Sequence, residues 1–144
     1  MSMNNYKIFS KKNRVLYNGK PSVLSEDDIL SIIDGAFSSC HYWAFLHTEM
    51  EEWSEMPVNE GIASSEWCAK LLIDDDAIIY FSDAECGGNK NDPDFELWEL
   101  TLKDLLKGFY LNRDHRKECD IDCMDGTSYD CILQYALFGE IIYG

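Results

Sequence analysis

The C-terminal segment from residue 127 to residue 138 constrains the fold most, because its apolar residues occupy two sides of a helix. One stripe recurs at helical spacing and consists of Tyr129, Ile132, Leu133, Ala136 and Leu137. The opposite side carries a second stripe at i, i+4 and i+7, made of Cys131, Tyr135 and Phe138. A helix that is apolar on both sides is buried on both sides. The segment therefore predicts either the central helix of the domain or a self-association surface, and with it a possible homodimer.

Three more helices are expected near residues 25–38, 63–72 and 101–111. Ser25 is a good N-cap, and the acids that follow it suit the positive end of a helix dipole. Thr101 and Asp104 fit the acidic form of a capping box. The segment Thr127–Asp130 is expected to cap the last helix in the same way, and Gly139 to end it.

The expected strands lie near residues 77–81 and 95–100, and they may pair across a loop rich in Gly, Asn and Asp. The runs YKIF (6–9) and RVLY (14–17) suit an N-terminal hairpin or two edge strands. Residues 40–46 fit a strand or a tight return into the core, and residues 141–143 can add a terminal strand. Together these elements predict an α+β fold, with a small antiparallel sheet packed against about four helices. The length of 144 residues fits one domain, residues 1–144, with a basic N-terminal segment, residues 1–20.

Charge is distributed very unevenly along the chain. The net charge is −15, yet residues 1–20 hold five Lys and Arg residues and no acid. The remaining residues hold seven basic side chains and all 27 acidic ones, a net charge of −20. Between Pro21 and Ala69 there are ten acids and no Lys or Arg. Such a chain repels nucleic acid and anionic membranes and attracts basic partners. A plain effect on solubility is the alternative interpretation.

The N-terminus has no apolar stretch of the kind that a secretion signal needs, and no apolar run approaches the length of a membrane span. A cytoplasmic location is therefore expected, unless a signal was removed before this numbering begins, and the six cysteines are expected to be free thiols.

Metal-binding patterns are weak, and no cofactor is expected. His115, Cys119 and Cys123 could ligate zinc, but their spacing departs from the usual knuckle. The acids from Asp120 to Asp125 resemble a calcium loop, yet position 12 is Cys131 instead of the required Glu. Cys40 and His41 would point in opposite directions on a strand, so they do not form a nucleophile and base pair. An enzyme is therefore not expected.

The segment around Trp53 is a candidate interface. An exposed aromatic side chain surrounded by acidic residues suits docking onto a basic, partly apolar surface. The alternative is that Trp53 packs back onto the core and the acids are only its solvent-exposed rim. With the other acidic loops, the predicted interface consists of Glu49, Glu51, Glu52, Trp53, Glu55, Met56, Asp74, Asp75, Asp76, Asp83 and Glu85.

Two segments carry a resemblance to a class of proteins. The ending from Asp130 to Gly144 and the stretch from Trp98 to Gly108, with Tyr42-Trp43, resemble small acidic proteins encoded by phages and mobile elements of Gram-positive bacteria. Such viral proteins are often inhibitors of host defence, including anti-CRISPR and anti-restriction proteins, and several are DNA mimics. The resemblance implies context and carries no catalytic residue.

Three hypotheses follow. The first is a non-enzymatic inhibitor of a host defence system that binds a basic nucleic-acid-binding surface of a nuclease or ribonucleoprotein through an acidic face. It implies a protein–protein interaction, with no direct contact to nucleic acid or membrane. The second is a small-molecule binder that sequesters a nucleotide signal with stacking aromatics such as Tyr42, Trp43 or Trp98. The third is a zinc protein or metal-dependent enzyme.

Overall fold

The computed structural model describes residues 14–47, 53, 64–84, 91–93, 95–115 and 126–143, and it bears out the α+β fold. The four helices are α1 (Glu26–Ser39), α3 (Ser64–Asp74), α4 (Leu102–His115) and α5 (Gly126–Phe138). The strands of this part of the chain are β1 (Arg14–Tyr17), β2 (Lys20–Ser25), β3 (Ala44–His47), β4 (Ile79–Asp83) and β5 (Leu97–Leu100).

The first two strands form an antiparallel hairpin. Asn18 and Gly19, with φ angles of 53° and 81°, make the turn. Positive φ at both central residues is the geometry of a type I′ turn, which Asn-Gly favours. Residues 14–17 form the expected strand and pair with β2, a partner that the sequence patterns did not suggest. Their predicted pairing with residues 6–9 stays a prediction. Residues 6–9 lie outside the described residues.

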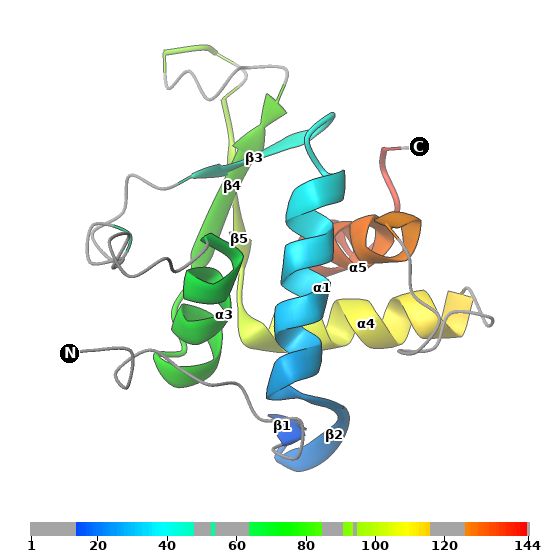
Figure 1. The fold of residues 1–144 in the computed structure, drawn as a ribbon. Coiled ribbons are helices and arrows are strands. Elements are labelled where there is room, and N and C mark those ends of the chain that lie inside the picture. The colour runs from blue at the N-terminus through cyan, green and yellow to red at the C-terminus, as the bar shows by residue number, and fades with distance from the viewer. Residues whose placement is uncertain are drawn as a thin grey trace.

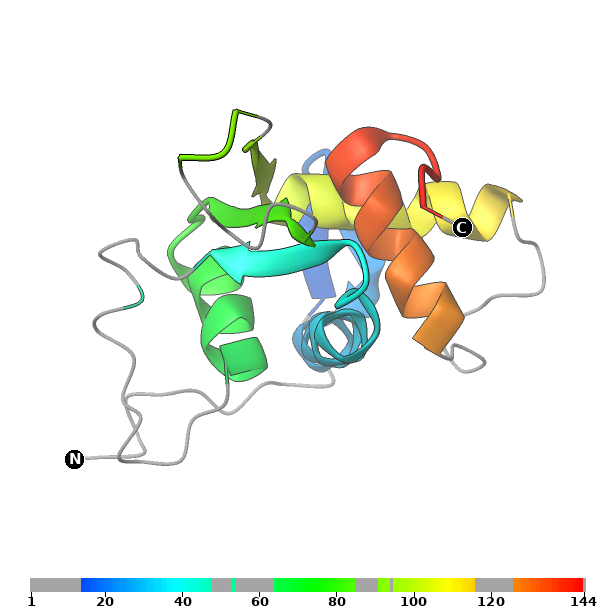
Figure 2. The same ribbon diagram turned by 90° about the horizontal axis from the view of Figure 1, so that it is seen from above.

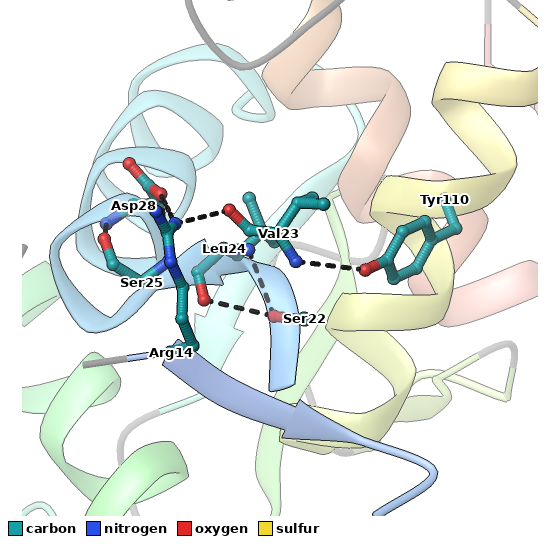
Figure 3. A network of polar contacts seen from close by, with 7 residues as sticks. All are labelled: Arg14, Ser22, Val23, Leu24, Ser25, Asp28 and Tyr110. Carbon is teal, nitrogen blue, oxygen red and sulfur yellow. Dashed lines mark hydrogen bonds and ion pairs between the residues drawn. The ribbon is translucent and has the colours of Figure 1, made fainter. Parts of the chain in front are cut away.

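The hairpin is fixed to the helices by polar contacts (Figure 3). The Arg14 guanidinium donates to the carbonyl of Val23 at 2.6 Å and lies 3.8 Å from the Asp28 carboxylate. The backbone N–H of Val23 donates to the Tyr110 hydroxyl of α4 at 3.3 Å. Ser25 and Asp28 exchange hydrogen bonds in a complete capping box at the start of α1. At Arg14, the basic N-terminal segment thus lies on the acidic body of the protein.

The second sheet has the strand order β3-β4-β5 and is antiparallel throughout. The predicted pairing between the segments near 77–81 and 95–100 is confirmed as β4 with β5. One face carries Leu46, Phe81 and Leu100, and Phe81 contacts Phe37 of α1 at 6.0 Å between ring centroids. Figure 2 shows α1 and α3 below this face. The hairpin is a separate sheet, so the single sheet expected from the sequence is divided in two.

Helix α1 lies between α3 and α5 (Figure 1). The Ser65 hydroxyl, in the first turn of α3, donates to Asp34, in the second half of α1, at 2.9 Å. The two helices are therefore antiparallel, and the beginning of α1 and the end of α3 lie at the same end of the molecule, at the bottom of Figure 1.

The second apolar stripe of α5 stays a predicted self-association surface, but the helix itself is packed within the domain. It packs against α1 and α4 and also contacts β5. Gly108 allows α4 to approach α5 closely. A Cβ atom on Gly108 of α4 would lie 2.6 Å from the carbonyl oxygen of Ile132 and 2.8 Å from the backbone nitrogen of Ala136.

Helix boundaries agree with the predictions to within a few residues, with α4 extending four residues further, to His115. Residues 40–46 contain both predicted features, since a turn at 41–43 leads into β3. Gly139, with φ of 76°, follows the end of α5 as expected. Residues 141–143 form no strand. None of the helices in the described ranges has the length and apolar character that crossing a lipid bilayer would need.

We expect Gly108→Ala to lower the free energy of unfolding by about 1–3 kcal/mol, because the new methyl group meets the backbone of α5 and forces the helices apart. Urea unfolding measures the change. Lys107→Ala, at the neighbouring exposed position, is the control and should change stability by less than about 0.5 kcal/mol. A Gly108→Ala protein more stable than wild type would show that the two helices do not touch there.

Candidate functional site

Asp130 lies at the centre of a hydrogen-bond network and is itself buried, with only 8% of its surface exposed. Its Oδ1 atom accepts from the Trp43 indole Nε1–H at 2.6 Å. Its Oδ2 atom accepts from the Tyr42 hydroxyl at 2.7 Å and from the Gln134 side-chain amide at 3.4 Å. Three neutral donors therefore hold the carboxylate, and two of them, Trp43 and Tyr42, join α5 to the turn between α1 and β3.

Gln134, one helical turn further along α5, holds the C-terminal segment in place with hydrogen bonds. Its side-chain carbonyl accepts from the backbone N–H groups of Ile142 at 2.9 Å and Tyr143 at 2.8 Å. Its amide donates to the Tyr143 carbonyl at 3.0 Å. A segment that forms no strand thus has its backbone groups satisfied by one buried side chain.

Aromatic rings surround the network. Trp43 is fully buried and stacks on Tyr143, with ring centroids 5.2 Å apart and planes 15° apart. Phe138 meets Trp98 edge to face at 4.9 Å and contacts Trp43 at 5.7 Å. These contacts keep water from the Trp43 side of the carboxylate, so the hydrogen bond from the indole is formed in a dry environment.

A cleft of about 660 Å³ opens beside Asp130. Helix α5 contributes Thr127, Asp130 and Cys131 to the lining. The remaining lining comes from the end of α1, the following turn and the C-terminal segment, and consists of Ser39, Tyr42, Ile141 and Tyr143. The cleft has a volume in the range of small-molecule and side-chain binding sites.

The network changes the acidity of two neighbouring groups. Burial, the hydrogen bond to Asp130 and the negative charge of Asp130 together raise the pKa of Tyr42 to about 12, so its hydroxyl stays protonated and keeps donating. Burial, followed by the charge of Asp130, raises the pKa of the Cys40 thiol to about 11. The thiolate is the nucleophilic form of cysteine, and Cys40 is therefore protonated and inert at neutral pH.

The predicted acidic interface is only partly within the described residues. Trp53 is 8% exposed and belongs to the hydrophobic core, so the interpretation in which its ring packs onto the core is the correct one. Asp74, Asp75 and Asp76 are exposed at the end of α3, and Asp83 is half-buried on β4. The other predicted members lie outside the described residues and are Glu49, Glu51, Glu52, Glu55, Met56 and Glu85.

The second stripe of α5 is used within the chain. Phe138 joins the aromatic cluster, Tyr135 stacks on His115 at 5.6 Å with planes 10° apart, and Cys131 lines the cleft. The candidate zinc ligand His115 is exposed in α4, whereas Cys119 and Cys123 lie outside the described residues. Within the described ranges, no three His, Cys, Asp or Glu side chains are grouped to hold a metal ion. The buried cysteines Cys40 and Cys68 are free thiols.

Sequence reasoning missed the role of Asp130. The segment Thr127–Asp130 was expected to cap the last helix, but α5 already begins at Gly126 and the Asp130 carboxylate bonds to Trp43 and Tyr42. The available indication was an Asp and a Gln four residues apart on a helix that is otherwise almost entirely apolar. Polar groups in that position are buried and need partners.

Comparison of the chain with family models, with curated proteins and with solved structures gives no match.

Replacing Asp130 by Leu should lower the free energy of unfolding by about 2 kcal/mol, because the buried Trp43 N–H loses its only acceptor in the described part of the chain. Urea unfolding of the variant measures this. The matched control is Asp114→Leu at an exposed position of α4, which should leave stability within about 0.5 kcal/mol. Equal or greater stability of Asp130→Leu would mean that burial of the carboxylate costs more than its hydrogen bonds return.

Proposed function

We propose that the protein is a non-enzymatic inhibitor, encoded by a phage or mobile element, that acts in the host cytoplasm on a defence nuclease or ribonucleoprotein of the anti-CRISPR or anti-restriction target class. It binds a basic nucleic-acid-binding surface of that target with its own acidic surface. The observation that carries the proposal is the gathering of acids, three of them exposed, at the end of the molecule where α1 begins and α3 ends.

This acidic end is defined by Glu26 and Asp27, which are half-buried at the start of α1, and by Asp74, Asp75 and Asp76, which are exposed where α3 ends. Asp75 lies 3.9 Å from Lys70, whereas Asp27, Asp74 and Asp76 form no ion pair with a described residue. The antiparallel packing of α1 and α3 brings the two groups of carboxylates to one end of a rigid helical pair (Figure 1).

Excess negative charge extends beyond this end. The described part of the chain carries sixteen acidic and six basic side chains. A surface of this kind attracts the rows of Lys and Arg with which nucleases bind phosphates. Its binding releases the counterions that surround those Lys and Arg residues, as the binding of DNA does. The charge also speeds the encounter with such a target.

The cleft beside Asp130 does not favour the alternative of a sequestered nucleotide. Its described lining holds a carboxylate and no Lys or Arg, so it repels phosphate. Trp43, one of the proposed stacking residues, is fully buried against Tyr143, so its ring is not available to a base.

DNA cleavage assays test the proposal with a panel of type I and type II restriction nucleases and Cas9-type and Cas12-type guide complexes. We expect inhibition of at least one enzyme, weakening at least about tenfold between about 50 and 200 mM salt, without binding of the inhibitor to DNA. The triple variant Asp27→Lys, Asp74→Lys, Asp76→Lys should weaken inhibition at least about tenfold, because three attractive charges become repulsive.

The matched control has the same change of net charge at other exposed positions and carries Glu99→Lys, Asp114→Lys and Glu140→Lys. It should keep most of the inhibition. Inhibition of no enzyme in the panel would contradict the proposal. Equal loss in the two triple variants would place the binding surface elsewhere.

A further inference from the structure

The carboxylate of Asp130 carries a negative charge that no described residue neutralises. It is more than nine-tenths buried, and its hydrogen-bond donors are an indole, a phenol and an amide, all of them neutral. Asp130 forms no ion pair with any residue in the described ranges. Buried carboxylates are normally paired with a positive charge. The missing charge can approach from the cleft, because Asp130 is one of the residues that line it.

The hydrogen bonds already present limit what this charge can be. A carboxylate has about four acceptor positions, and three of them are used by Trp43, Tyr42 and Gln134. About one position remains for a ligand. A guanidinium group binds best with two parallel hydrogen bonds to one carboxylate, which this arrangement does not offer. An ammonium group needs only one acceptor on Asp130 and can direct its other N–H groups elsewhere.

The cleft supplies those other acceptors. Ser39 and Thr127, two residues that carry hydroxyl groups, are both in the lining. The Ser39 hydroxyl donates to the Gly35 carbonyl at 2.8 Å, so its oxygen remains free to accept. A primary ammonium, with three donors, therefore finds acceptors of the right kind around one cleft.

The rest of the lining is apolar and aromatic. Ile141 is 40% exposed, Tyr42 is 55% exposed, and Tyr143 lines the cleft while stacking on Trp43. Such walls suit the methylene stem of a long side chain, and the faces of Tyr rings attract a cation. A volume of about 660 Å³ also leaves room for the backbone on either side of that side chain.

We propose that the cleft beside Asp130 binds a primary alkylammonium group, and that its source is a lysine side chain of the partner protein. The choice of a partner's lysine rests on the proposed function, because that function requires a basic protein surface. The preference for an alkylammonium group rests on the cleft alone.

Isothermal titration calorimetry with three short peptides tests the site. The probes are acetyl-Gly-Lys-Gly-amide, its arginine counterpart and its norleucine counterpart, which keeps the stem without the charge. We expect saturable one-to-one binding of the lysine peptide, at least about tenfold tighter than the norleucine and arginine peptides. Norleucine binding as tight as lysine would overturn the role of the charge. Tighter binding of arginine would overturn the preference for ammonium.

The source of the ammonium group is tested with spermidine and n-butylamine. Weaker binding of both amines than of the lysine peptide supports a protein lysine, because the cleft then also uses the flanking backbone. Tighter binding of either free amine would overturn that assignment and identify a free amine as the ligand.

Two variants connect binding to the cleft. Asp130→Asn should weaken lysine binding at least about tenfold, since the ligand loses its charged acceptor. Ser39→Lys should abolish binding without loss of fold, because it places an internal ammonium in the cleft and adds a cation to the last turn of α1. The matched control is Ser38→Lys, an exposed neighbour outside the lining, which should bind the peptide as wild type does.

Unchanged binding in Ser39→Lys would overturn the site even if Asp130→Asn fails to fold. The triple variant at the acidic end leaves the cleft intact and should keep its affinity for the lysine peptide. Lysine binding without inhibition of any nuclease would therefore contradict the proposed function alone, and inhibition without lysine binding would contradict the cleft alone.

Discussion

Removing a carboxylate from water costs several kcal/mol, and the protein offsets that cost at Asp130 with three hydrogen bonds from neutral groups. Two of the donors lie outside α5, and the third lies on α5 and connects it to the C-terminal segment. Trp43 and Tyr42 belong to the turn that joins α1 to β3, and Gln134 holds the C-terminal segment. The orientation of α5 against these elements therefore depends on one charge. The aromatic rings that pack over Trp43 keep that interaction dry and strong.

The close packing of α5 makes this arrangement possible. Gly108 lets α4 approach the backbone of α5, and α1 contacts α5 from another side. Because α5 is packed on two sides, its remaining surface can move little. Asp130 and the cleft therefore have a fixed geometry. The acidic end, formed where α1 begins and α3 ends, is on a rigid pair of helices in the same way. The protein therefore carries two negatively charged features, a group of acids at one end of the molecule and a single buried acid, Asp130.

Much of the fold could be predicted from local patterns, because helix stripes, caps and the Gly139 terminus depend on neighbouring residues alone. The two apolar stripes of α5 predict a helix packed on two sides, whereas the elements that pack there depend on residues distant in sequence. The Asn18-Gly19 turn is a local indication of the hairpin between β1 and β2, which the pairing predicted for Arg14–Tyr17 did not use. The burial of Trp53 and the role of Asp130 depend on residues distant in sequence, since Trp43 lies 87 positions from its acceptor. No periodicity reports such a contact, although an acid on an apolar helix indicates that a partner exists.

The central claim is that the buried Asp130 carboxylate is the charged floor of a binding cleft as well as a structural link. The most direct measurement follows the indole N–H resonance of Trp43, assigned with Trp43→Phe, while acetyl-Gly-Lys-Gly-amide is titrated into the labelled protein. The account predicts that this resonance and the Gln134 side-chain amide shift together and reach saturation, because a cation on Asp130 withdraws charge from both hydrogen bonds. The Trp67 indole, which is absent from the cleft lining, should not move. A Trp43 resonance that stays in place while the peptide binds elsewhere would contradict the account.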